Sequence, residues 1–118
     1  MMAKILVVED DPWSQRIVCD VLMMHGHDVL TADGVSSARM QLVQRPEIVL
    51  LDINIPGGGG EAFLHEIRAD DAQLPVIALT ASAMQGDRER FLKQGFTAYM
   101  SKPIDVRTFA ATVEEYVR

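Results

Sequence analysis

The sequence predicts an α/β fold in which a parallel five-stranded sheet is covered by helices on both faces. Apolar runs of strand length alternate with segments of helical period from one end of the 118 residues to the other. The apolar runs are also continuous, which is typical of strands that are buried on both faces of a sheet. A chain of this length forms one domain with a sizeable core, so residues 1–118 are predicted to be a single domain.

The predicted strands and helices alternate strictly along the chain. The strands are Lys4–Val8, Asp28–Ala32, Ile48–Leu51, Val76–Leu79 and Ala98–Ser101. The helices are expected at Pro12–Met24, at about 35–44, around Phe63–Ile67, at about 86–94 and at about 106–117. This order of elements is that of a doubly wound sheet.

Local signals justify individual helices. Asp11 is well placed to cap the first helix, Pro12 suits its first position, and Gly26 follows its end. The side chains predicted to face the core from the second and third helices are Ala38, Leu42, Val43, Phe63, Leu64 and Ile67.

Composition and charge exclude several classes of protein. The formal net charge of -6 and the pI of about 4.9 argue against direct binding to nucleic acid or to anionic lipid. No apolar run approaches the roughly 20 residues that span a bilayer. The first residues, MMAKILVVEDD, do not resemble a signal peptide, and the single cysteine, Cys19, fits a reducing cytoplasm.

The candidate site residues follow the first, third, fourth and fifth predicted strands. They are Glu9, Asp10 and Asp11 after the first, Asp52 after the third, Thr80 after the fourth and Lys102 after the fifth. Ligands bind to open parallel sheets beyond the carboxyl ends of the strands. In the flavodoxin-like strand order 2-1-3-4-5, the first and third strands are neighbours, so Glu9, Asp10 and Asp52 are expected to share one crevice.

The residue types in this predicted crevice indicate phosphoryl chemistry. Crowded carboxylates repel one another unless a cation intervenes, and their hard oxygen atoms suit Mg²⁺. Lys102 supplies a positive charge for a phosphoryl oxygen, and Thr80 supplies a hydroxyl. A carboxylate nucleophile, a metal, a cation and a hydrogen-bond donor together could move a phosphoryl group onto an aspartate.

The chain resembles response-regulator receiver domains of two-component signalling over essentially its whole length. Four motifs at these spacings carry the resemblance: ILVVEDD (5–11), IVLLDINIPGGGG (48–60), VIALTASA (76–83) and AYMSKPI (98–104). The resemblance implies that Asp52 accepts a phosphoryl group from a phosphohistidine. It also implies that Mg²⁺ is bound directly by Asp10, Asp52 and the backbone carbonyl of Asn54, with Glu9 acting through a water.

The same resemblance assigns roles on the far side of the crevice. Lys102, the Thr80 hydroxyl and the Ala81 amide would contact the phosphoryl oxygens, and Tyr99 would swing inward when Thr80 moves. The Lys102-Pro103 peptide bond is expected to be cis. Asn54 and Ser82 are expected to influence how fast the aspartyl-phosphate hydrolyses.

One segment departs from the family pattern. Receiver domains often have Pro-Gly-x-Asp-Gly after the phosphoacceptor, whereas this chain has four consecutive glycines, residues 57–60, with Gly59 in place of the acid. Glycine leaves the backbone with high conformational freedom, so we expect a mobile loop that Mg²⁺, phosphorylation or a partner could order.

The expected partners are a histidine kinase or histidine phosphotransfer protein and a downstream protein effector. The stretch TASAMQGDR (80–88) resembles single-domain regulators of bacterial cell division and receiver modules of hybrid histidine kinases. A stand-alone regulator, monomeric or weakly dimeric after phosphorylation, is favoured, and a module of a hybrid kinase or multidomain regulator is the alternative. The chain is expected to act as a signalling switch and not as an enzyme.

Other classes fit the sequence less well. A phosphatase of the haloacid-dehalogenase type needs Asp-x-Asp after the first strand, whereas Asp52, Ile53 and Asn54 follow the third. A flavodoxin-like cofactor binder needs a phosphate loop after the first strand, and the glycine run lacks the Lys-Ser/Thr of a P-loop. A phosphorylation-independent interaction module would not need the full set of acids.

Overall fold

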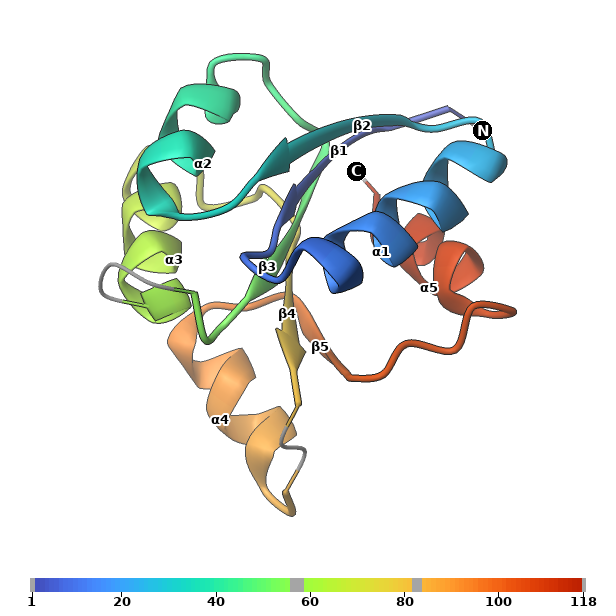
Figure 1. Cartoon of the computed structure of the whole chain (residues 1–118). Helices are drawn as coiled ribbons and strands as arrows, with labels where there is room; N and C mark the ends of the chain where they lie inside the picture. The colour runs from blue at the N-terminus through green and yellow to red at the C-terminus, as the bar shows by residue number, and fades with distance from the viewer. Residues whose placement is uncertain (1, 56–58, 82–83, 118) are drawn as a thin grey trace.

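The fold of the chain is given by a computed structural model that describes residues 2–55, 59–81 and 84–117. Strands and helices alternate throughout the described chain (Figure 1). The strands are β1 (Lys4–Val8), β2 (Asp28–Ala32), β3 (Ile48–Asp52), β4 (Val76–Thr80) and β5 (Ala98–Ser101). The helices are α1 (Pro12–Met24), α2 (Val35–Leu42), α3 (Gly59–Asp70), α4 (Asp87–Gln94) and α5 (Phe109–Tyr116).

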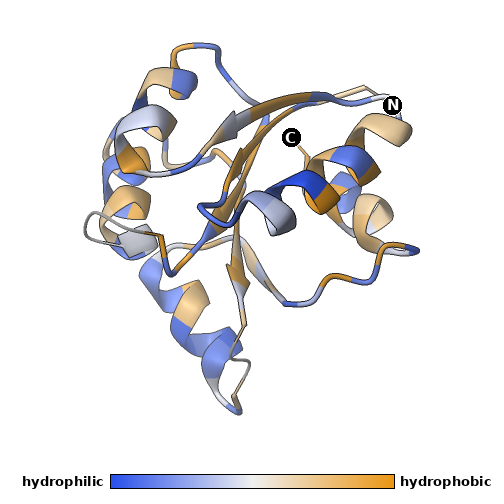
Figure 2. Ribbon diagram, in the orientation of Figure 1, coloured by the Kyte–Doolittle hydropathy of each residue, from blue (hydrophilic) through white to orange (hydrophobic). Residues whose placement is uncertain are grey.

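The five strands form one parallel sheet in the order β2-β1-β3-β4-β5, which confirms the predicted flavodoxin-like topology. Helices α2, α3 and α4 cover one face of the sheet, and α1 and α5 cover the other (Figure 1). The central strands are hydrophobic along their length (Figure 2). Successive residues of a strand alternate between the two cores, so Leu6 and Val8 face α2 and α3 while Ile5 and Val7 face α1 and α5.

Most of the predicted local signals are confirmed. The Asp11 side chain accepts a hydrogen bond from the Ser14 amide at 3.2 Å, and Pro12 is the first residue of α1. On α3, the buried residues include Phe63, Leu64 and Ile67, as the helical period predicts.

The sequence misplaced the ends of two helices. α2 stops at Leu42, and Val43, predicted to face the core, is 79% exposed. The chain then passes through Arg45 at a φ of 56°, so it turns away from the helix two residues after Val43. α5 begins at Phe109 and not near Val106, because the residues before it form a turn in which the Thr108 and Phe109 amides donate to the Asp105 carbonyl.

Two buried or partly buried polar side chains join elements at the amino ends of the strands. The Arg68 guanidinium on α3 donates to the carbonyls of Gly95, Asp71 and Leu74 at 2.9, 3.2 and 2.7 Å. His27 accepts from the Ala3 amide at 3.0 Å through Nδ1, and its Nε2 lies 2.6 Å from Glu114 Oε2 on α5. These contacts tie helices on both faces to the sheet, far along the strands from the acids discussed below.

Candidate functional site

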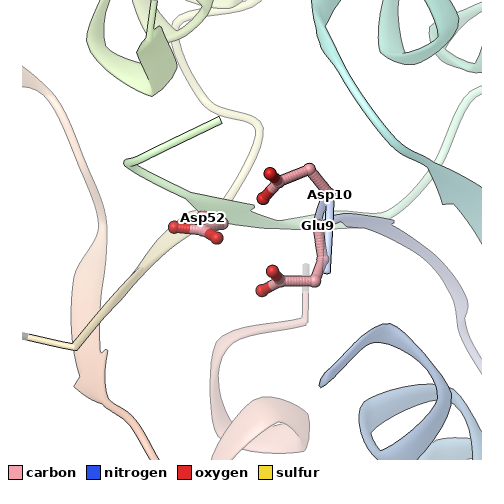
Figure 3. Close-up of side chains that lie close together, drawn as sticks. All are labelled: Glu9, Asp10 and Asp52. Atoms are coloured by element: carbon pink, nitrogen blue, oxygen red, sulfur yellow. The ribbon is translucent and has the colours of Figure 1, made fainter. Parts of the chain in front are cut away.

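Three carboxylates meet at the carboxyl ends of the two central strands. Glu9 and Asp10 directly follow β1, and Asp52 is the last residue of β3. Val8 pairs with Leu51 in the parallel ladder, so the next residue on each strand, Glu9 and Asp52, lies at the same level. One oxygen atom from each of Glu9, Asp10 and Asp52 lies within 4.8 Å of the others (Figure 3). The crevice predicted from the strand ends is therefore present.

Lys102 lies inside this crevice. Its Nζ donates to Asp52 Oδ2 at 2.9 Å and forms a second, shorter ion pair with Glu9 Oε2. The backbone places the lysine there: its amide donates to the Thr80 carbonyl at 2.7 Å, and the Lys102-Pro103 peptide bond is cis, as expected. A single ammonium group thus neutralises part of the charge of two buried carboxylates.

Backbone amides hold the remaining oxygens of the two buried acids. Asp52 Oδ1 accepts from the Asn54 amide at 2.9 Å, and Glu9 Oε1 accepts from the Asp11 amide at 3.2 Å. Asp10 differs from both because its side chain is exposed. The site therefore has two fixed carboxylates beneath one carboxylate that faces solvent.

Burial and crowding shift the ionisation of this cluster. Desolvation raises the pKa of Glu9, and the nearby Asp52 raises it further, although the Lys102 ammonium acts in the opposite direction. Burial alone would lower the pKa of Lys102, but its hydrogen bonds to Glu9 and Asp52 outweigh this and raise the pKa. The lysine therefore stays protonated while Glu9 holds a proton more readily than an ordinary glutamate.

The residues predicted on the far side of the crevice occupy two different places. Thr80 is buried at the end of β4, beside β3, and the exposed Ala81 follows it. Tyr99 lies on β5 and packs against Phe91 of α4, with 5.7 Å between ring centroids. Tyr99 therefore belongs to the α4–β5 layer and not to the carboxylate cluster. Ser82, expected to affect hydrolysis, lies outside the described residues.

Gly60 allows a close contact with the loop after Asp52 that the sequence did not suggest. A Cβ at Gly60 would lie 2.9 Å from Ile53 Cα and 3.0 Å from the Asp52 carbonyl oxygen. The start of α3 therefore packs directly on the backbone that follows Asp52. The mobile loop predicted for the glycine run stays a prediction, because residues 57 and 58 lie outside the described chain. Gly60 instead serves a close approach of two backbone segments.

The donor set fits a divalent cation such as Mg²⁺. Three carboxylate oxygens lie within 4.8 Å of one another, and hard oxygen ligands are those that Mg²⁺ prefers. The exposed Asp10 leaves room for the waters that Mg²⁺ usually retains. Asn54, whose backbone carbonyl was also predicted to bind the metal, is exposed two residues after Asp52.

Comparison with known proteins identifies the family. The profile of the response regulator receiver domain matches residues 5–114. The polar-differentiation response regulator DivK of Brucella anthropi is 33% identical over 99% of this chain and 98% of its own length. The chain belongs to the response regulator receiver family of two-component systems. Proteins of this family interact with kinases or phosphotransfer proteins and with effectors.

Solved structures agree with the fold. The receiver domain of the sensor histidine kinase PA1611 from Pseudomonas aeruginosa, 33% identical, has a TM-score of 0.86 with coverage of 98% of both chains. That structure has a magnesium ion coordinated in its active-site cleft. The chemotaxis protein CheY4 of Vibrio cholerae, 24% identical, has a TM-score of 0.90 over 99% of this chain and 100% of its own, which supports the fold alone.

Proposed function

We propose that the chain is a phosphorylation-controlled switch in which Asp52 is the phosphoacceptor. The observation that carries this proposal is the placement of Asp52, which is buried beside Glu9 with Lys102 Nζ at 2.9 Å. Its other oxygen accepts a hydrogen bond from the backbone amide of Asn54. An acid held in this way has a fixed direction of attack and a cation ready for the charge that the reaction brings in.

In the proposed reaction, one carboxylate oxygen of Asp52 attacks the phosphorus of a phosphohistidine on a partner. The new O–P bond forms as the N–P bond breaks, and the imidazole leaves with the electron pair of that bond. After the transfer, the Lys102 ammonium contacts the negatively charged phosphoryl oxygens in place of the Asp52 carboxylate. The Thr80 hydroxyl and the Ala81 amide donate hydrogen bonds to the same phosphoryl oxygens. Asp10, Asp52 and the Asn54 carbonyl would hold Mg²⁺ directly and Glu9 would hold it through a water, and the ion would supply positive charge that offsets the carboxylates and the phosphoryl group.

The consequence of phosphorylation is a change of surface shape. Thr80 ends β4, and Tyr99 lies one strand away against Phe91. Movement of Thr80 toward the phosphoryl group would open space that the Tyr99 ring fills. The face formed by α4, β5 and α5 would then change its population between two states, and an effector protein would bind one of them.

The proposed product is a signal, so we infer a switch and not a turnover enzyme. The proposed partners are a histidine kinase or phosphotransfer protein and a protein effector, with no direct contact to nucleic acid. Both similarities expected from the sequence appear among the relatives, one a DivK protein and one the receiver domain of a histidine kinase. Within the described residues, no helix is long and apolar enough to cross a membrane.

Chemical phosphorylation tests the assignment of Asp52. The chain is incubated with acetyl phosphate, with and without Mg²⁺, and its mass is measured together with those of Asp52→Asn and Asp20→Asn. Asp20 is an exposed acid on α1, paired only with Arg16 in the described structure, and serves as the matched control. We expect one Mg²⁺-dependent phosphoryl group on the wild type and on Asp20→Asn, and none on Asp52→Asn.

The contrary results are equally clear. A phosphoryl group on Asp52→Asn would mean that another residue is the acceptor. Modification of the wild type that does not depend on Mg²⁺ would mean that the acid cluster does not act through a metal. Either result would overturn the proposed function.

A further inference from the structure

Gln15, in the first turn of α1, has no part in the proposed chemistry but contacts the backbone beneath the acids. Its Nε2 donates to the Glu9 carbonyl at 3.0 Å and to the Ala32 carbonyl at 3.4 Å. Both partners can only accept, so the NH₂ group and not the oxygen of the amide must face them. One side chain therefore bridges the backbone at the ends of β1 and β2.

This bridge fixes the peptide unit between Glu9 and Asp10, which lies just beyond the last hydrogen bond between β1 and β2. β1 ends at Val8, and the Glu9 amide still donates to the Ala32 carbonyl at 2.9 Å. The Glu9 carbonyl belongs to the next peptide unit, which joins Glu9 to Asp10, and Gln15 is its donor among the described residues. Gln15 thus holds the plane of the peptide that leads into Asp10.

Asp10 depends on its backbone more than the other two acids do. The carboxylates of Glu9 and Asp52 contact Lys102 and backbone amides. The Asp10 carboxylate is exposed, and among the described residues none forms a hydrogen bond with it. Its distance from the other two oxygens therefore follows from the orientation of the Glu9–Asp10 peptide and from its own rotamer.

We propose that Gln15 is a positioning residue for the metal site: its amide orients the Glu9–Asp10 peptide so that the Asp10 carboxylate faces Glu9 and Asp52. The inference rests on the proposed function, since it assigns Asp10 to Mg²⁺. Groups that orient metal ligands without touching the metal commonly change affinity by about 10- to 100-fold when removed. Because Gln15 acts through the backbone, the lower end of that range applies.

The test compares Gln15→Met with Gln41→Met in a titration with MgCl₂ followed by ¹H–¹⁵N NMR of the full chain. Methionine keeps the length of the side chain and removes the amide. Gln41 is the matched control because its Nε2 also donates to a strand carbonyl, that of Thr31 at 3.1 Å, away from the acids. Gln15→Arg restores N–H donors at nearly the same position.

We expect Gln15→Met to weaken Mg²⁺ binding by about tenfold. The backbone amide signals of Asp10 and Asp11 should also shift before any metal is added. Gln41→Met should bind Mg²⁺ within about twofold of the wild type. Gln15→Arg should recover most of the lost affinity, because its N–H groups can again donate to the Glu9 carbonyl and orient the Glu9–Asp10 peptide. A loss of thermal stability common to both methionine variants would not account for this difference.

Other results overturn the inference in distinguishable ways. If the wild type binds Mg²⁺ and Gln15→Met binds it equally well, Gln15 has no positioning role, while the proposed function stands. If Gln15→Met and Gln41→Met weaken binding equally, the effect is one of general stability and the inference fails. If the wild type itself binds no Mg²⁺, the metal site fails, and the proposed function and this inference are both overturned.

Discussion

Polar groups are buried at both ends of the sheet, but they are satisfied in opposite ways. At the amino ends of the strands, the Arg68 guanidinium donates to three backbone carbonyls. At the carboxyl ends, Glu9 and Asp52 share the single ammonium of Lys102. The amino end therefore pairs hydrogen-bond donors with acceptors, whereas the carboxyl end holds two like charges around one cation.

The difference shows where the molecule is built for stability and where it is built for binding. Breaking a satisfied network leaves buried polar groups unpaired, which lowers the free energy of unfolding. Removing a charge from a crowded site does not lower the free energy of unfolding, because the native state already bears the cost of holding the like charges together. Substitutions at the two ends should therefore have opposite effects on stability and on function.

The largest loss of stability is expected at the amino-end network. Arg68→Met should lower the free energy of unfolding by about 3 kcal/mol, because three carbonyls lose their donor. Arg16→Met, which removes an exposed ion pair with Asp20, should change it by less than about 0.5 kcal/mol. Urea denaturation measures both, and equal effects would remove the contrast between the two ends.

A smaller loss is expected where α3 meets the loop after Asp52. Gly60→Ala should lower the free energy of unfolding by about 2 kcal/mol, since its Cβ would meet backbone atoms that cannot move aside cheaply. Gly34→Ala, with no atom within 4 Å of the added Cβ, should cost less than about 1 kcal/mol even though Gly34 caps α2. Thermal unfolding compares them, and a harmless Gly60→Ala would mean that the close approach is absent.

At the crowded end, removing a charge should not weaken the fold. Glu9→Gln is expected to leave the free energy of unfolding of the metal-free chain unchanged or higher at neutral pH, because the raised pKa shows that ionised Glu9 is held at a cost. Mg²⁺ affinity should fall in the same variant. Denaturation with and without Mg²⁺ measures both, and a strongly destabilised Glu9→Gln would place this glutamate among the stabilising contacts.

The smallest expected effect is a shift in the pH dependence of Mg²⁺ binding. Protons and Mg²⁺ compete for Glu9, so affinity should decline as pH falls through the pKa of Glu9, which lies above the ordinary value of 4.5. The folded state binds this proton more readily than the unfolded state, so the same fall in pH should stabilise the metal-free protein through this group. Calorimetric titrations across this range should show the decline in the wild type and a weaker one in Glu9→Gln.

Sequence patterns predicted the strands, their order and the acids at their ends, because continuous apolar runs and strand-end acids are local signals. They did not predict the exposed Val43 or the late start of α5, where turns at Arg45 and Asp105 override helical period. Nor did they indicate the contacts of Arg68, because backbone carbonyls leave no mark in the sequence and one of the three, that of Gly95, is brought close by the fold. Gly60 was missed for a similar reason: its neighbour is backbone brought close by the fold.

The proposed switch requires that charge added at Asp52 changes the layer that contains Tyr99. The direct measurement is NMR of the Tyr99 ring and Thr80 signals with and without beryllofluoride and Mg²⁺, in the wild type, Asp52→Asn and Lys102→Ala. We expect both sets of signals to change in the wild type alone, with Lys102→Ala still binding Mg²⁺. Unchanged Tyr99 signals in beryllofluoride-bound wild type, or the same change in Asp52→Asn, would contradict the claim.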